Sequence, residues 1–424
     1  MRYDNGALIC SLRGFISAHR HGKCPPHPEP DLSNNSVTVD NQLQGEFYRS
    51  NPINKHAISK SEMLLFCLNR NNKQKGKAKM KVDSGISSDL SKVPKQAKAL
   101  EELGMSGIMT AETAHDPFFP LLVAAQNTEH VELITSIAVA FARTPMILAN
   151  IGHDLNQYSK GRFVLGLGSQ IKPHITKRFS MPWSNPAARM REYILAMRAI
   201  WANWHQQEPL AFTGKFYTHT LMTPMFTPTD TQYGAPRVLL AAVGPMMTEV
   251  AGEVADGIIV HAFTTEKYMR EVTMPALERG FAKSGRKRED FEISYPSFLV
   301  TGTTEEAMSE AARATRKQIA FYGSTPAYKP VLESIGAGDL QGDLNTMSKQ
   351  GRWDEMGELI TDDILNAFAV VSEPDGVADE ILRRYGDMVD RTSAAYGGIP
   401  ADQQRSIIDK LSGHQSKNNP STSR

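Results

Sequence analysis

The residues best suited to chemistry stand close together in the segment TAETAHDPFFPL. Glu112, His115 and Asp116 fall within one short loop of this segment. A carboxylate beside an imidazole can perform general acid–base work or orient a cofactor ring. A structural alternative is that Asp116 caps a helix beginning at Pro117 while His115 lies in solvent. The cap accounts for Asp116, and Glu112 and His115 remain as the candidate catalytic residues.

A second candidate segment is LGLGSQIKPHITKRF, at the end of an apolar run. Gly166 and Gly168 would let the backbone approach a ligand closely, because they carry no side chain. The basic residues that follow them are Lys172, His174, Lys177 and Arg178. Their positive charge suits an anionic cofactor tail, although a solvated basic loop has the same composition.

A third candidate is the junction AAVGPMMTEVAGEVADG, where Gly244 ends an apolar run and Pro245 opens a helix. The first amides of a helix have no partner within it, so this turn could cradle a phosphate. Any strand–Gly-Pro–helix junction has the same pattern, and the motif alone does not separate a phosphate site from an ordinary turn.

These segments need elements to position them, and from Met80 onward short apolar runs alternate with amphipathic helical stretches. The predicted strands are 80–86, 106–112, 131–140, 162–169, 237–244, 256–263, 291–302 and 364–371. Eight strands alternating with helices predict an α/β fold, a single (β/α)8 TIM barrel. A doubly wound sheet would require a glycine-rich turn after the first strand, which DSGISSDL matches poorly. All three candidate segments fall at strand C-terminal ends, where barrels place catalytic groups.

Two longer stretches lack simple periodicity and predict insertions in the barrel. They are 205–235, after the fourth helix, and 323–362, after the seventh. Such insertions would wall or cover the active-site face. The aromatic residues that could build a substrate pocket, or could equally be core residues, are Trp183, Phe212, Phe216, Tyr217 and Tyr328.

The two ends of the chain differ in composition from the middle. Residues 1–79 are rich in Pro, Asn, Ser and basic residues, and bury too little apolar surface to offset the entropy of ordering. We therefore expect a low-order N-terminal extension over 1–79, a barrel over 80–411 and a disordered tail over 412–424. The extension is either a regulatory or targeting tail, or an upstream segment with Met80 as the functional start.

Bulk properties narrow the class of partner. The net charge of +1 gives no electrostatic case for nucleic acid or an anionic membrane. No apolar run approaches the roughly 20 residues that span a bilayer, and no secretory signal is evident, so we expect a cytoplasmic protein. The three cysteines, Cys10, Cys24 and Cys67, match no zinc pattern, and we expect no metal site.

The order of these motifs resembles the bacterial luciferase-like monooxygenase family, and in particular its deazaflavin-dependent oxidoreductase branch. The resemblance covers residues 80 to about 410. It rests on TAETAHDPF, TSIAVAFARTPMILA, SKGRFVLGLGSQIKPHI, LLAAVGPMMTEVAGEVADGIIV and VSEPDGVADEI. No single motif is specific, but their order and spacing together are.

The resemblance implies a role for each segment. The third strand would end in a bulge with a non-proline cis peptide at Ser136–Ile137, which backs a flavin-like ring, and Glu112 would be the carboxylate after strand two. Residues beside the ring and its ribityl chain would be Gly168, Ser169, Gln170 and His174. The phosphate cradle would be Ala242, Val243, Gly244, Pro245, Met246 and Met247.

Two departures from the family pattern bear on the reaction. Many relatives carry His directly after the strand-two carboxylate, where this chain has Thr113. Certain deazaflavin-dependent sugar-phosphate dehydrogenases carry Glu in the strand-four loop, where this chain has Ile171. Both departures leave the proton donor or base open and argue against that dehydrogenase activity.

The first hypothesis is therefore an oxidoreductase that uses a deazaflavin coenzyme of the 8-hydroxy-5-deazaflavin type for hydride transfer with a small organic substrate. The second is an FMN-dependent monooxygenase supplied with reduced flavin by a partner reductase. A homodimer is compatible with either. Two alternatives come from other classes: a catalytically silent flavin-binding protein, and a metal-dependent phosphohydrolase suggested by the His-Asp pairs at His115 and His153.

Overall fold

The computed structural model describes residues 80–393, 396 and 398–413. The predicted N-terminal extension, 1–79, lies outside the described residues, as does the tail from 414 onward. Ser412, which was assigned to the tail, is instead the last residue of helix α16 (Ala401–Ser412).

Eight parallel strands close into a barrel, which confirms the predicted fold. The closure is made by β1, which pairs with both β2 and β13, and by β3, which pairs with β5. The barrel strands are β1 (Lys81–Gly85), β2 (Gly107–Thr110), β3 (Glu132–Thr135), β5 (Phe163–Gly168), β8 (Arg237–Ala242), β9 (Gly257–Val260), β10 (Glu292–Tyr295) and β13 (Arg391–Ser393). A short strand β4 (Ala138–Val139) continues from β3 and pairs with the end of β5.

Helices connect the strands. They are α3 (Val93–Leu103), α4 (Phe118–Gln126), α5 (Pro145–Tyr158), α6 (Pro186–Gln206), α7 (Pro245–Val254), α8 (Glu266–Tyr268), α9 (Met274–Ser284), α15 (Pro374–Tyr385) and α16. Their limits follow from local chemistry. Gly104 ends α3 in the left-handed region at φ 91°. Thr144 caps α5, because its side chain accepts the main-chain N–H of Ile147. Pro145 follows it as the first residue of the helix, where proline is favoured.

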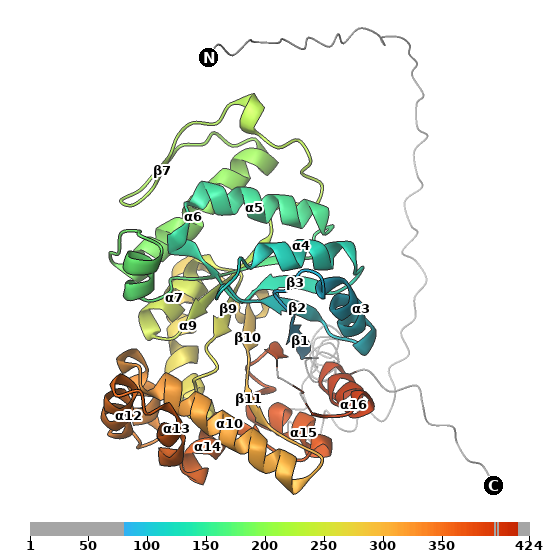
Figure 1. The fold of residues 1–424 in the computed structure, drawn as a ribbon. Helices are drawn as coiled ribbons and strands as arrows, with labels where there is room; N and C mark the ends of the chain where they lie inside the picture. The colour runs from blue at the N-terminus through green and yellow to red at the C-terminus, as the bar shows by residue number, and fades with distance from the viewer. Residues whose placement is uncertain (1–79, 394–395, 397, 414–424) are drawn as a thin grey trace, which may run out of the picture. The chain divides into compact units, whose positions relative to one another are not determined.

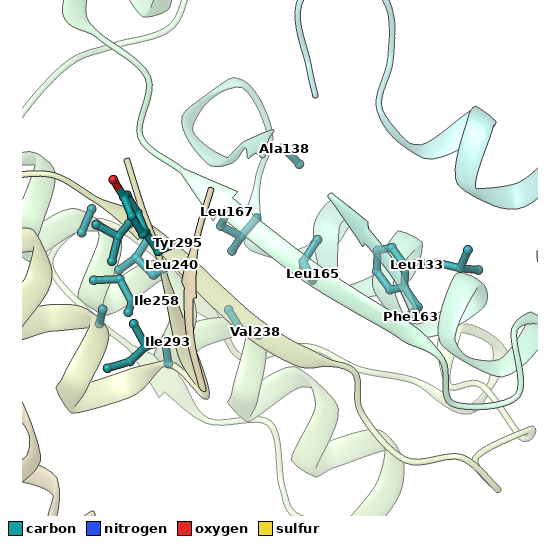
Figure 2. Packing of buried hydrophobic residues seen from close by; sticks show 14 of the residues in the cluster. Leu133, Ala138, Phe163, Leu165, Leu167, Val238, Leu240, Ile258, Ile293 and Tyr295 are labelled. Atoms are coloured by element: carbon teal, nitrogen blue, oxygen red, sulfur yellow. The ribbon is translucent and has the colours of Figure 1, made fainter. Parts of the chain in front are cut away.

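The main core lies between strands and helices. Figure 2 shows Leu165, Val238 and Ile258 among its side chains, each from a barrel strand. A smaller cluster fills the barrel itself and consists of Ile134, Val164, Leu239 and Ile259. Side chains alternate between these two cores along β3, β5, β8 and β9, because successive residues of a strand point to opposite faces.

The N-terminal ends of the strands carry a charge cluster rather than apolar side chains. Arg391 is fully buried there, and its guanidinium pairs with Asp83 (Nε to Oδ2, 3.1 Å), Glu292 (Nη1 to Oε1, 3.0 Å) and Glu132. Lys81 and Arg237 pair with the same two glutamates from the more exposed side. The cluster ties β1, β3, β8, β10 and β13 together at the end of the barrel away from the candidate segments.

The predicted position of the eighth strand, 364–371, was wrong. Thr361 accepts the N–H of Ile364 and starts helix α14 (Asp362–Phe368) within that stretch. The rest of it forms β12 (Ala369–Val371), which pairs with β11 (Phe298–Val300) outside the barrel. The eighth barrel strand is β13, which is polar and short, so its apolar pattern is too weak to identify it.

Both predicted insertions are present. The first, between α6 and β8, contains the hairpin β6 (Phe212–Thr213) and β7 (Thr218–His219). The second follows α10 (Glu305–Gly323) in the connection from β10 to β13. It contains α11 (Lys329–Ser334), α12 (Leu340–Lys349) and α13 (Trp353–Met356). In Figure 1 the hairpin with β7 lies beyond α5 and α6, and α10 to α14 gather on the other side of the barrel strands.

Candidate functional site

A cavity of about 570 Å³ opens at the C-terminal ends of the barrel strands. This volume lies within the range of ordinary small-molecule and cofactor sites. Its floor is apolar, because it is lined by Ile259, which belongs to the cluster inside the barrel, and by Ile137 and Ala241, which pack against that cluster. The predicted site residues that line it are Glu112, Ser136, Ile137, Gly168, Ser169, Gln170, Ala242 and Val243. Four segments far apart in the sequence therefore meet at one cavity.

Glu112 is held as an ion pair in the cavity wall. Its Oε2 lies 2.7 Å from Nη1 of Arg143 and accepts the main-chain N–H of Val139, also at 2.7 Å. Only 6% of the Glu112 side chain is exposed. The other arm of Arg143 binds Asp116 at 3.1 Å. Glu112 thus presents a fixed negative charge and joins the loop after β2 to the last residue of β4.

The peptide bond between Ser136 and Ile137 is cis, as predicted. The predicted strand 131–140 is divided at this point into β3 and β4. Main-chain hydrogen bonds hold the turn on both sides: Ser136 N–H donates to Thr110 at 2.6 Å, and Glu112 N–H donates to Ile137 at 3.2 Å. The turn presents Ser136 and Ile137 to the cavity.

The loop after β5 contributes backbone rather than large side chains. A Cβ atom added to Gly168 would lie 2.7 Å from Cδ1 of Ile137, so a larger residue here would displace the Ile137 side chain that lines the cavity. Ser169 and Gln170 follow along the cavity, with Gln170 in the left-handed region at φ 57°. His174 begins the short π-helix η2 (His174–Arg178), is exposed and does not line the cavity.

The predicted phosphate cradle is divided between the cavity and its edge. Ala242 and Val243 line the cavity, whereas Gly244, Pro245, Met246 and Met247 form the first turn of α7 next to it. A Cβ atom added to Gly244 would meet nothing within 4 Å, so there is open space at this helix N-terminus. Such space beside unpaired helical amides can accept an anion.

His115 and most of the predicted pocket aromatics lie elsewhere. His115 is exposed and does not line the cavity. Trp183 packs edge-on against Phe141, and Tyr217 against Tyr193. The hairpin residues Phe212 and Phe216 also lie outside the cavity lining, so of the five predicted aromatics only Tyr328 lines it.

Three lining residues were not identified as a group from the sequence: His261, Tyr322 and Tyr328. The His261 ring stacks on Tyr328, with centroids 5.0 Å apart, and meets Tyr322 edge-on at 4.7 Å. The sequence does indicate the position of His261. It lies two residues beyond Ile259 and four beyond Gly257, so it falls on the same inward face of the strand. Tyr322 lies in the last turn of α10, where nothing local indicates a cavity.

The described residues contain no group of three or more His, Cys, Asp or Glu side chains placed to hold a metal ion. His153, from the second His-Asp pair, is buried in α5, with its Nε2 3.4 Å from Oδ1 of Asp230. In the described part of the chain no helix has both the length and the apolar composition that crossing a bilayer requires.

Comparisons with known proteins agree with this architecture. The model of the luciferase-like monooxygenase family matches residues 61–391. An uncharacterised protein of Mycobacterium tuberculosis is 54% identical over 316 residues, covering 74% of this chain and 93% of the relative. A second protein of that species, provisionally named a coenzyme F420-dependent oxidoreductase, is 28% identical over 300 residues, covering 67% of this chain and 84% of the relative.

Two solved structures show the same fold. The coenzyme F420-dependent tetrahydromethanopterin reductase from Methanopyrus kandleri matches with a TM-score of 0.64 at 19% identity, covering 80% of this chain and 98% of that chain. The oxygenating constituent of 3,6-diketocamphane monooxygenase from Pseudomonas putida, in complex with FMN, matches with a TM-score of 0.53 at 17% identity, covering 80% and 97%. Since the family model spans nearly all of the barrel and the 54%-identical relative covers most of the chain, this protein belongs to the luciferase-like monooxygenase family.

Proposed function

We propose that this chain is an oxidoreductase that binds a deazaflavin coenzyme of the 8-hydroxy-5-deazaflavin type and catalyses hydride transfer with a small organic substrate. The observation that carries the proposal is the single cavity formed by the Ser136–Ile137 turn, the Gly168–Gln170 loop and the end of β8 at Ala242–Val243. The 28%-identical relative with an F420-dependent name supports this coenzyme class.

The residues present fit such a coenzyme. Ile137 offers an apolar surface for one face of a flat ring, and Gly168 lines the cavity beside it, where the ribityl chain would run. The open space at Gly244 suits the phosphate, where the amides of the first turn of α7 would hold it. When bound, the coenzyme supplies the hydride chemistry, and the protein supplies orientation and exclusion of water.

Glu112 and His115 are the proposed catalytic residues after β2. Glu112 would place its fixed charge against the ring, because its carboxylate is already oriented by Arg143 and Val139 before any ligand enters. His115, exposed in the same loop, would exchange protons with solvent. The two roles are separable, since only Glu112 lines the cavity.

Absorbance and fluorescence titration of the purified protein with the deazaflavin coenzyme and with FMN tests the proposal. We expect saturable binding of the deazaflavin with a dissociation constant at least tenfold below that of FMN. Tighter binding of FMN would overturn the coenzyme assignment in favour of a monooxygenase supplied by a partner reductase. Binding of neither would overturn the function as a whole.

A further inference from the structure

The imidazole of His261 has a defined tautomer. His261 follows β9 directly, and its Nδ1 accepts the main-chain N–H of Phe263 at 3.0 Å. An N–H donor requires an unprotonated nitrogen as its acceptor, so in the neutral ring the proton is on Nε2. No group of the described residues pairs with Nε2. His261 therefore keeps one N–H donor available to whatever enters the cavity that it lines.

The surroundings of this ring keep it neutral and oriented. Tyr328, from the second insertion, stacks on one face of the ring, and Tyr322, from α10, contacts it edge-on. Burial lowers the pKa of His261 to about 4, so the ring is uncharged near neutral pH. A neutral imidazole held in this way can polarise a carbonyl as a hydrogen-bond donor.

The remaining charges in the cavity decide what kind of molecule this donor can serve. Among the described residues that line it, none is Lys or Arg. Glu112 is the one carboxylate that the described part of the chain contributes to the lining, and it is already paired with Arg143. A substrate phosphate or carboxylate placed here would lose its hydration without gaining a counterion, which is costly.

We propose that His261 is a substrate-binding residue that selects an uncharged carbonyl compound, or the corresponding alcohol, by donating its Nε2–H to the oxygen. The inference rests on the proposed function for its hydride donor. In the reducing direction a bound deazaflavin would supply the hydride to the carbonyl carbon, and His261 would hold the oxygen that receives the C=O π pair. That oxygen then takes a proton from water, which gives the alcohol. Tyr322 and Tyr328 position His261 and close the apolar side of the substrate site.

Two substitutions separate the acceptor role of Nδ1 from the donor role of Nε2. His261→Asn keeps an acceptor near Nδ1 for the Phe263 N–H and removes the donor at Nε2. His261→Gln keeps an N–H donor near the position of Nε2. The probes are cyclohexanone, its oxygen-free isostere methylenecyclohexane and the anion cyclohexanecarboxylate. Affinities of all three proteins are measured by ligand-observed NMR titration, without coenzyme and with the oxidised deazaflavin, and ¹⁵N-histidine labelling of the parent reports the Nε2 resonance of His261.

We expect cyclohexanone to bind the parent and to move the Nε2 resonance of His261, while methylenecyclohexane leaves that resonance in place. His261→Asn should weaken cyclohexanone binding about tenfold, the value of one hydrogen bond of about 1.4 kcal/mol. His261→Gln should restore most of the affinity. Cyclohexanecarboxylate should bind more weakly than cyclohexanone to all three proteins.

Equal affinity of His261→Asn and the parent for cyclohexanone would overturn the proposal, as would tighter binding of the carboxylate. Equal binding of methylenecyclohexane and cyclohexanone to the parent would do the same, because the oxygen would then contribute nothing. The coenzyme-free measurements keep this test separate from the proposed function. Failure of the deazaflavin titration with retained ketone selectivity would contradict the proposed function and leave the role of His261 in ketone binding in place.

Discussion

Glu112 and Arg143 form an ion pair in the wall of the cavity, with 2.7 Å between Oε2 and Nη1. The same Oε2 accepts the main-chain N–H of Val139, so one carboxylate oxygen joins the loop after β2 to β4 beyond the Ser136–Ile137 turn. This relationship makes Glu112 a fixed charge rather than a mobile base. It also gives its substitution a distinct expected signature.

Glu112→Gln should lower turnover more than coenzyme affinity. The amide keeps the shape and one oxygen acceptor but removes the charge that faces the site. We expect kcat to fall by roughly tenfold to a hundredfold, with the coenzyme dissociation constant changed by less than about threefold. Asp116→Asn is the matched control, because it removes the more exposed partner of Arg143 and leaves the Glu112 pair in place. Equal effects of the two substitutions on kcat would contradict the assignment.

Gly244→Val should weaken binding of either candidate cofactor by roughly tenfold, because the new side chain would occupy the space proposed for the phosphate. The barrel should stay folded, since an added Cβ meets no atom within 4 Å. Gly342→Val in α12 is the control, being another glycine with open space around its Cβ position. Titration of coenzyme and thermal unfolding measure both effects. Unchanged affinity in Gly244→Val would move the anion site to the loop with Lys172 and Arg178.

Arg391→Met should destabilise the protein by about 3–5 kcal/mol, because it leaves the buried Asp83 and its neighbouring glutamates without their central cation. Arg237 belongs to the same cluster, but its side chain is 40% exposed. Arg237→Met should therefore lower the free energy of unfolding by about 1 kcal/mol or less. Denaturant unfolding of the two variants gives the comparison. A similar loss of stability in both would show that burial of Arg391 is not what makes it important.

Asp83 should make the protein less stable as the pH rises, whereas an ordinary ion-paired carboxylate, whose pKa is lowered, makes a protein more stable as the pH rises. Burial raises its pKa from 3.8 to about 6. The folded state therefore holds the proton more tightly than the unfolded state, and this contribution is complete below pH 3.8 and is lost as the pH rises through 6. Relative to Asp83→Asn, the parent should lose up to about 3 kcal/mol between pH 4 and 6.5. Titrating groups that do not interact with Asp83, such as His261, contribute equally to both proteins and cancel in the difference. A constant difference across this range would contradict the raised pKa.

The sequence determined the barrel and half of its cavity by local rules. Apolar runs alternating with helices predict parallel strands, and parallel strands in a barrel bring their C-terminal ends together. The segments at Glu112, Ser136–Ile137, Gly168–Gln170 and Ala242–Val243 therefore had to meet, whatever the details of the packing. The same local pattern placed both insertions between the correct elements.

Only the tertiary structure decided the features that depend on partners distant in the chain. β13 is stable as a barrel strand because Arg391 pairs with Asp83, Glu132 and Glu292, and its own three residues carry no apolar pattern. The stretch predicted as a strand, 364–371, is mostly helical because Thr361 caps helix α14. Its last residues form β12, which pairs with β11 and not with a barrel strand. The cavity wall of His261, Tyr322 and Tyr328 exists because the second insertion packs back over β9. A residue pattern along one strand or helix cannot specify such contacts, since their energy comes from side chains that meet only after the chain has folded.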